Sequence, residues 1–376
     1  MKYNPLPFVV SFLILISCTK KETQENIPCQ VLSINVESDK LRTEEPALPN
    51  FRYVKLETKE ECLLEDVIKI TPYNNKLFIL SSSGKGNVYV FDDKGNYLYQ
   101  IKKGEGPENI MYPTDITINE EKKSLVILDA YRNIKEYDPE TGQFLKKTIM
   151  KDPFFSIETI GNDFLLFDPN SRKQSDFYLR YLSNEKEYKD LFPKPIKGSF
   201  FSLPNFFTKI TPREVLVSCI FSDTIFSINN TQQELSPYIV FNFQGKEANN
   251  PRNLEGIESL GKYLDNAKER KLVTGPCDVC SFNGNLFFTL KGENNYFVTY
   301  DSKENKVLLH KTLFEGLPNM YTSVGRTEKE VIYAIDMPWL MEYFTENPPT
   351  NSEIIKQLKQ ECNNTDDNPV LLFGSF

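Results

Sequence analysis

Histidine and tryptophan are the scarcest residues of this 376-residue sequence, which contains one of each. A single histidine leaves too few imidazoles for the usual zinc sites, which combine several histidines or four thiolates. It also argues against a Ser-His-Asp mechanism, because nothing in the sequence places a nucleophile and an orienting acid beside His310. His310 lies in the largely apolar run Lys306–Leu313, where we predict an ordinary strand residue.

Basic clusters and long apolar runs are missing as well. The 44 lysines and arginines are outnumbered by 52 acidic residues and form no basic stripe, which argues against a nucleic-acid partner. The apolar run Phe8–Ile16 is too short for a transmembrane helix. Because Lys2 precedes it, the pattern is typical of a secretory signal peptide.

Leu15-Ile16-Ser17-Cys18 follows this run and resembles the lipobox of bacterial lipoproteins. The resemblance implies cleavage before Cys18 and a lipid on Cys18 that holds the protein on a membrane. Thr19 stands where inner-membrane lipoproteins have aspartate, which favours an outer-membrane lipoprotein on the periplasmic face or the cell surface. The predicted parts are a signal peptide (1–17), a lipidated tether and lead-in (18–49) and a folded domain (50–376). A plain signal peptide with a chance cysteine is the alternative.

Short strand-forming runs separated by turn residues dominate the chain from residue 51 onward. One unit of four predicted strands comprises Val67–Thr71, Lys76–Leu80, Asn87–Phe91 and Tyr97–Ile101. The next segment repeats it with Thr114–Ile118, Ser124–Leu128, Asn133–Tyr137 and Phe144–Thr148. An aromatic residue ahead of the last turn of each unit recurs about every 45 residues, at Phe91, Tyr137, Tyr181 and Phe226. Such a period predicts a β-propeller.

Two helical insertions interrupt the repeat. Apolar residues spaced three and four apart predict an amphipathic helix near 251–272, and similar spacing recurs near 338–362. The sixth unit then lacks a strand, which Phe51–Leu56 could supply by pairing with Pro369–Phe373. We therefore predict an all-β, six-bladed propeller closed by its N- and C-terminal strands. A β-sandwich with helical insertions is the alternative, although it does not explain the period.

The sequence also resembles a family of six-bladed β-propeller lipoproteins with an architecture like that of NHL propellers. The residues that carry this resemblance are Tyr53–Leu63, Gly104-Glu-Gly-Pro107 and Asp366–Phe373. It implies a fold and a place in the cell envelope, and no shared reaction. In this chain Glu108 and Asn109 follow Pro107 where the family pattern has a second glycine, and the sixth unit is rebuilt.

Acidic and amide side chains near the predicted inner strands are the candidate ligand-binding residues, namely Glu105, Asp115, Glu158, Asn205 and Asp278. Oxygens from several blades could hold calcium or a sugar, since calcium takes six to eight oxygen ligands. Each of these residues could equally be a solvated polar group at a strand end. For Glu105, the flanking glycines suit a backbone crossing between blades. No catalytic set is predicted, and the identity of any metal stays open.

Cys277-Asp-Val-Cys280 is the one local pattern with redox or metal spacing. A zinc ribbon would need a second cysteine pair, and a thioredoxin-like motif would need a helix N-terminus. Structural thiols and a local disulfide are the two interpretations that we retain. The remaining cysteines are expected to be small buried hydrophobes, at Cys29, Cys62, Cys219 and Cys362.

These features favour a cell-envelope binding or scaffold module that presents a propeller face to a protein partner or a glycan. The alternative is an enzyme, either a metal-dependent hydrolase or lactonase or a lyase, with carboxylates at the mouth of the channel. The fold alone does not distinguish these two functions, because propellers have many unrelated functions.

Overall fold

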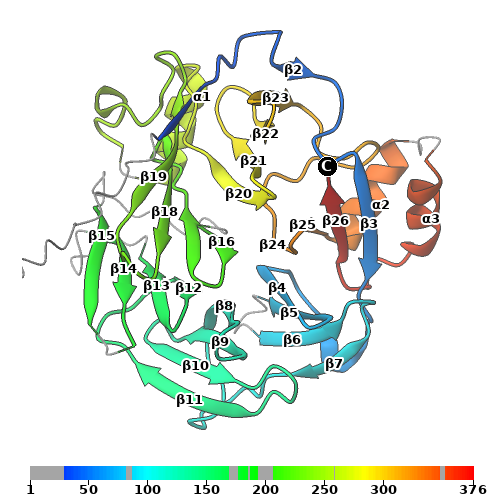
Figure 1. Cartoon of the computed structure of the whole chain (residues 1–376). Helices are drawn as coiled ribbons and strands as arrows, with labels where there is room; N and C mark the ends of the chain where they lie inside the picture. Colours follow the sequence, from blue (N-terminus) through cyan, green and yellow to red (C-terminus); the bar gives the residue numbers. More distant parts are fainter. Residues whose placement is uncertain are drawn as a thin grey trace, which may run out of the picture.

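The computed structural model describes residues 29–81, 87–168, 177–184, 187–193, 206–257, 259–347 and 352–376. Strands dominate it, and the predicted all-β, propeller-like fold is confirmed. Figure 1 shows the sheets arranged around a common centre. No helix in these residues is long and apolar enough to cross a membrane.

The strands form antiparallel units of four that follow one another along the chain. The first three units are β4 (Lys69–Tyr73), β5 (Lys76–Ser81), β6 (Asn87–Asp92), β7 (Tyr97–Gln100); β8 (Pro113–Asn119), β9 (Ser124–Asp129), β10 (Asn133–Tyr137), β11 (Phe144–Ile149); and β12 (Ser156–Ile160), β13 (Asp163–Phe167), β14 (Phe177–Leu182), β15 (Tyr188–Pro193). The next two are β16 (Phe207–Thr211), β17 (Glu214–Val217), β18 (Thr224–Asn229), β19 (Ser236–Asn242); and β20 (Cys277–Phe282), β21 (Asn285–Leu290), β22 (Tyr296–Asp301), β23 (Lys306–His310).

The last unit uses both ends of the described chain. Its strands are β24 (Gly325–Arg326), β25 (Val331–Ile335), β26 (Val370–Ser375) and β3 (Asn50–Lys55). Strand β3 pairs antiparallel with β26 over six residues, from Asn50↔Ser375 to Lys55↔Val370. A single parallel bridge, Gly325↔Ile70, joins this unit to β4. A Cβ at Gly325 would lie 2.3 Å from the Ile70 carbonyl oxygen, so only glycine permits this close approach.

Local sequence explains the strands and their turns. Asn74 and Asn75 connect β4 to β5 with φ angles of 49° and 58°, the left-handed conformation that a tight two-residue hairpin requires. Strands β5 and β9 are buried at nearly every position, because each lies inside a sheet whose two faces are covered by its neighbours. Their unbroken apolar runs therefore reflect two-sided burial.

The three helices lie in the two predicted insertions. Helix α1 (Leu260–Glu269) precedes β20, while α2 (Met337–Glu346) and α3 (Glu353–Glu361) lie between β25 and β26. Ser259 caps α1 by accepting a hydrogen bond from the backbone N–H of Lys262. Figure 1 shows α2 and α3 packed together beside β3 and β26.

The lead-in before residue 50 contains two strands that the sequence analysis had assigned to tether and lead-in. Strand β1 (Gln30–Ser33) pairs parallel with β19, and β2 (Arg42–Thr43) pairs parallel with β23. Burial of Leu32, Ile34 and Val36 fixes this segment on the outer edge of the sheets. Two exposed sheet edges are thereby covered.

Candidate ligand site at the centre of the ring

The first strand of each unit lies nearest the centre of the ring (Figure 1). Four successive first strands each carry one charged residue in this central region: Lys69 on β4, Asp115 on β8, Glu158 on β12 and Lys209 on β16. Asp115 and Glu158 are nearly inaccessible, with exposed fractions of 5% and 7%. We call these four residues the central cluster, and their contacts decide what the centre of the ring can bind.

Lys69 and Asp115 form an ion pair that joins the first two units. The Lys69 Nζ atom lies 2.7 Å from Asp115 Oδ1, which also accepts the backbone N–H of Ile116 at 2.8 Å. The other oxygen, Asp115 Oδ2, accepts the backbone N–H of Ile157 at 2.8 Å. Because Ile157 belongs to β12, this one carboxylate connects three neighbouring units.

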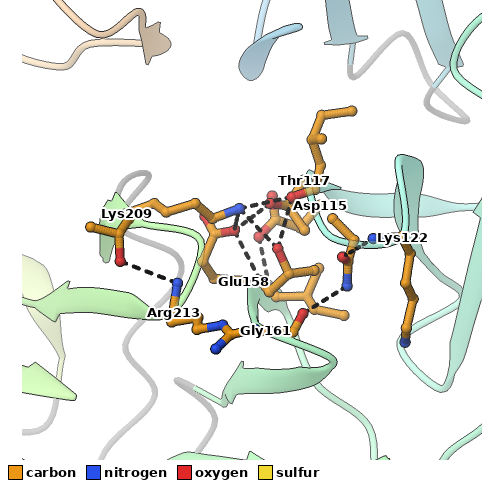
Figure 2. Close-up of polar contacts among 12 residues, drawn as sticks. Asp115, Thr117, Lys122, Glu158, Gly161, Lys209 and Arg213 are labelled. Carbon is orange, nitrogen blue, oxygen red and sulfur yellow. Dashed lines mark hydrogen bonds and ion pairs between the residues drawn. The ribbon is translucent and has the colours of Figure 1, made fainter. Parts of the chain in front are cut away.

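Glu158 and Lys209 form the second pair, which joins the third and fourth units (Figure 2). Glu158 Oε1 lies 3.0 Å from Lys209 Nζ, and it accepts hydrogen bonds from the Thr117 hydroxyl and from the Thr159 N–H at 2.9 Å. Lys209 Nζ also donates to the Ile118 carbonyl and to Thr159 Oγ1, each at 2.8 Å. The ammonium is therefore fully engaged.

The two carboxyl groups respond differently to burial. Loss of solvent raises the pKa of Asp115 despite the nearby Lys69 ammonium. Burial acts in the same direction on Glu158, but attraction to Lys209 and Lys69, together with the Thr117 hydrogen bond, outweighs it and lowers the pKa of Glu158. Burial opposes the charge on Lys69, yet Asp115 and Glu158 prevail and raise its pKa. At the centre, the attraction between opposite charges thus offsets the cost of burying Lys69 and Glu158.

This donor set is committed to internal partners. Each carboxylate faces an ammonium and accepts a backbone N–H group, which leaves fewer of its oxygen lone pairs for a calcium ion. Among the residues that the structure describes, no group of three or more His, Cys, Asp or Glu side chains is arranged to hold a metal ion. The geometry suits the fixed presentation of charge to a ligand.

Of the predicted site residues, Asp115 and Glu158 come together, each paired with a lysine, Lys69 or Lys209, that was not predicted. A signal for those lysines exists. The first strands of three units contain a charged residue followed by Ile-Thr, namely Lys69-Ile-Thr71, Asp115-Ile-Thr117 and Lys209-Ile-Thr211. Reading this repeat across units would have placed both lysines beside the carboxylates.

Of the other candidates, Asp278 is buried and Glu105 is exposed. Asp278 on β20 accepts hydrogen bonds from the Ser323 N–H at 2.7 Å and the Ser323 hydroxyl at 2.8 Å, and has a left-handed φ of 55°. Glu105 is exposed in the connection between β7 and β8. Asn205 and Cys18 lie outside the described residues.

The cysteines and the histidine occupy apolar surroundings. Cys277 and Cys280 are free, buried thiols on β20, and burial raises the pKa of Cys277 to about 12. Such a thiol stays protonated and unreactive at neutral pH. His310 ends β23, where Nδ1 lies 2.9 Å from the Glu45 carbonyl oxygen and Nε2 lies 2.8 Å from Thr299 Oγ1. Burial lowers the pKa of His310.

The sheet topology and the polar centre define a propeller-like β protein. The chain belongs to the family described as a domain of unknown function, DUF4934, which matches residues 31–375. No curated protein matches the sequence.

Solved structures give a matching fold. A crystal structure of a Bacteroides fragilis protein classed as exported matches with a TM-score of 0.78 and 21% identity, covering 92% of this chain and 99% of that chain. A streptogramin B lyase matches with a TM-score of 0.44 and 14% identity, covering 76% and 80% of the two chains. The RRP9 WD40 repeats match with a TM-score of 0.42 and 7% identity, covering 82% and 80%. The last two scores are too low to support an argument about this chain.

Proposed function

We propose that this chain is a lipid-anchored binding module of the cell envelope, and that its propeller-like domain binds a ligand over the central cluster. The observation that carries the proposal is the pair of ion pairs, Lys69–Asp115 and Glu158–Lys209, on four successive first strands.

A stability role alone is a weak explanation for these charges. Buried ion pairs are often replaced by well-packed apolar side chains with no loss of stability, since desolvation offsets much of their attraction. The Lys69 and Lys209 side chains also keep exposed fractions of 21% and 15%, so part of each side chain reaches solvent. A rigid polar centre that solvent can reach is suited to ligand recognition.

The envelope location is supported by the first residues of the sequence. Leu15–Cys18 resembles a lipobox, and the polar residues after it suit a tether. The exported classification of the Bacteroides fragilis protein agrees with secretion. We infer an outer-membrane lipoprotein, on the periplasmic face or at the cell surface, whose ligand is a glycan or part of an envelope protein.

The anchor is tested by Cys18→Ala. We expect this variant to lose fatty-acid labelling and to leave the membrane fraction, because it lacks the acylated thiol. Ser17→Ala is the matched control, because it keeps the thiol and a small residue before it. Unchanged labelling of Cys18→Ala would refute the anchor.

The binding role is tested by thermal unfolding of the full-length protein in detergent against a glycan panel, calcium and a chelator. A ligand at 100 times its dissociation constant adds about 2.7 kcal/mol of stability, which is measurable. A glycan-specific shift supports the proposal. A calcium shift that the chelator reverses would instead favour the metal-dependent hydrolase or lactonase. No shift, together with no co-purifying protein partner, would contradict a binding role.

A further inference from the structure

Arg326 is a third cation in the central region, and it differs from the two lysines. It ends β24, the first strand of the last unit, where it pairs with Val331 ahead of the turn to β25. Figure 1 shows β24 across the centre of the ring from β8 and β12. The Arg326 side chain is half-buried.

The other charged residues on the first strands have hydrogen-bond partners, whereas the described residues give Arg326 none. Lys69 bonds Asp115, Lys209 bonds Glu158, and Asp278 accepts hydrogen bonds from Ser323. Within the described part of the chain, the Arg326 guanidinium has neither a hydrogen-bond nor an ion-pair partner. A guanidinium carries five N–H donors, and no Arg326 nitrogen is among the fully buried polar atoms that lack a partner in the described residues, so these donors are accessible to water and to a ligand.

Electrostatic interactions connect the guanidinium with residues around the central cluster. Burial lowers the pKa of Arg326, while Cys280, Glu158 and Glu120 act in the opposite direction. Glu158 belongs to β12 and Glu120 follows β8. Arg326 therefore interacts electrostatically with residues of units on the other side of the ring. Glu158 also interacts electrostatically with Lys69 and Lys209.

Among the described first strands, Arg326 is the cation that no buried carboxylate pairs with. Asp115 and Glu158 pair with Lys69 and Lys209, and the third buried carboxylate on a first strand, Asp278, accepts hydrogen bonds from Ser323. Glu120, the remaining carboxylate near Arg326, is exposed and surrounded by water. A water-screened carboxylate compensates a buried cation only weakly.

We propose that Arg326 is the anion-recognition residue of the central site, and that the ligand carries an oxyanion: a carboxylate, sulfate or phosphate group. The planar guanidinium fork matches two oxygens of such a group with parallel hydrogen bonds. The proposal rests on the binding role proposed above and specifies the ligand class for that same site.

The test is isothermal titration of the full-length protein in detergent with inorganic phosphate, sodium sulfate and D-glucuronate, and with uncharged D-glucose for comparison. Binding of at least one anion is expected, and the three anions distinguish phosphate or sulfate recognition from carboxylate recognition. Low millimolar concentrations are used, because high sulfate stabilises proteins generally by exclusion from their surfaces.

Three variants locate the effect. Arg326→Gln should weaken anion binding by about tenfold or more, and Arg326→Lys should keep the charge but recover only part of the affinity. Arg252→Gln removes an exposed arginine before α1 and should leave binding unchanged. The unfolding midpoint of Arg326→Gln should equal or exceed that of the wild type, because the variant removes a half-buried cation without a partner.

Two results would overturn the proposal: no binding of any of the three anions to the wild type, or equal binding to the wild type and Arg326→Gln. If an uncharged glycan from the panel binds both proteins equally, the binding role stands and the assignment of Arg326 fails. A lowered midpoint for Arg326→Gln would indicate a structural role and would also count against it.

Discussion

Apolar side chains pack between neighbouring units on both sides of the ring, and one side adds buried ion pairs at the centre. On one side, the first strands β4, β8, β12 and β16 are linked by the ion pairs of the central cluster. Figure 2 shows the pair of Glu158 with Lys209. On the other side, the units around β20 and β24 pack through one large apolar group that includes α2 and α3. Phe314 lies within that group, with its ring centroid 5.3 Å from Phe51 and 5.8 Å from Tyr333.

This difference separates structure from recognition. Apolar contacts between sheets stabilise without directional requirements, so they suit the place where both ends of the described chain meet in one sheet. Ion pairs gain little over apolar packing but keep oriented charges near solvent. The charged side is therefore where we expect binding, and the apolar side is where we expect most of the stability of the joint between β3 and β26.

Breaking the apolar side should have the largest effect. Phe314→Ala removes a fully buried ring between β3 and β25, and we expect a loss of about 3–5 kcal/mol in the free energy of unfolding. Chemical denaturation at pH 7 measures it. The conservative Phe314→Leu keeps most of the volume and should lose less than half as much. A loss below about 1 kcal/mol for Phe314→Ala would show that this contact does not hold the joint.

Removing an ion pair on the charged side should lower the free energy of unfolding somewhat less. Glu158→Gln leaves Lys209 without its counter-ion, although the ammonium keeps its bonds to the Ile118 carbonyl and the Thr159 hydroxyl. We expect a loss of about 2–4 kcal/mol at pH 7, slightly less than for a fully buried pair. Adding Lys209→Met should restore part of the loss, because the double variant leaves no unpaired charge.

The pH dependence of that loss tests its ionic origin. The pKa of Glu158 is below its ordinary value of 4.5, so the stability it contributes is present above pH 4.5 and is lost as the pH falls through its folded-state pKa. The gap between the wild type and Glu158→Gln should therefore narrow in acid. A gap of the same size at pH 7 and at pH 3 would contradict the assignment.

On the apolar side, acid sensitivity should begin at a higher pH. Burial lowers the pKa of His310 below its ordinary value of 6.5, so its contribution is present above that pH and is lost as the pH falls through the folded-state pKa. His310→Gln should flatten the decline in stability between pH 7 and pH 5. Urea denaturation at each pH measures the free energy of unfolding. An identical decline for the wild type and the variant would assign the acid sensitivity to other groups.

The smallest expected effect concerns an exposed contact on the β3 side of the joint. Arg52 bonds Glu330 through Nε and a terminal nitrogen, at 2.8 and 2.9 Å, and stacks over Phe373. Because the pair is exposed to solvent, we expect Arg52→Met to lose about 0.2–1 kcal/mol. Raising the salt concentration should shrink this difference. A loss as large as that of Phe314→Ala would mean that ion pairs also dominate the apolar side.

Much of the fold could be predicted from the sequence because its signals are local. Turn residues such as Asn74 and Asn75 and the recurring aromatics mark each unit, and three-and-four spacing marks the helical insertions. The two edge strands β1 and β2 were missed, since their partners, β19 and β23, are distant in sequence and pair with them in parallel. The alternation of Leu32, Ile34 and Val36, all of which are buried, is a sequence signal for β1, and β2 has no comparable pattern.

The site was predicted less completely. Asp115 and Glu158 could be predicted as polar residues on first strands, but Lys69 and Lys209 could not, because a calcium or sugar site is recognised by its oxygen ligands and lysine has none. Which first strands are neighbours across the centre depends on the twist and order of the sheets. The same holds for Arg326, whose lack of a partner emerges only when the hydrogen bonds of every first strand are known.

Binding at the charged side can be measured directly by titrating inorganic phosphate, D-glucuronate and the glycan panel into three proteins. These are the wild type, the paired replacement Lys69→Met/Asp115→Leu, which removes one ion pair without leaving an unpaired charge, and Phe314→Leu on the apolar side. We predict binding to the wild type and to Phe314→Leu, and a loss of affinity of about tenfold or more for the paired replacement. Equal affinity in all three proteins, or binding to none, would contradict a ligand site at the centre of the ring.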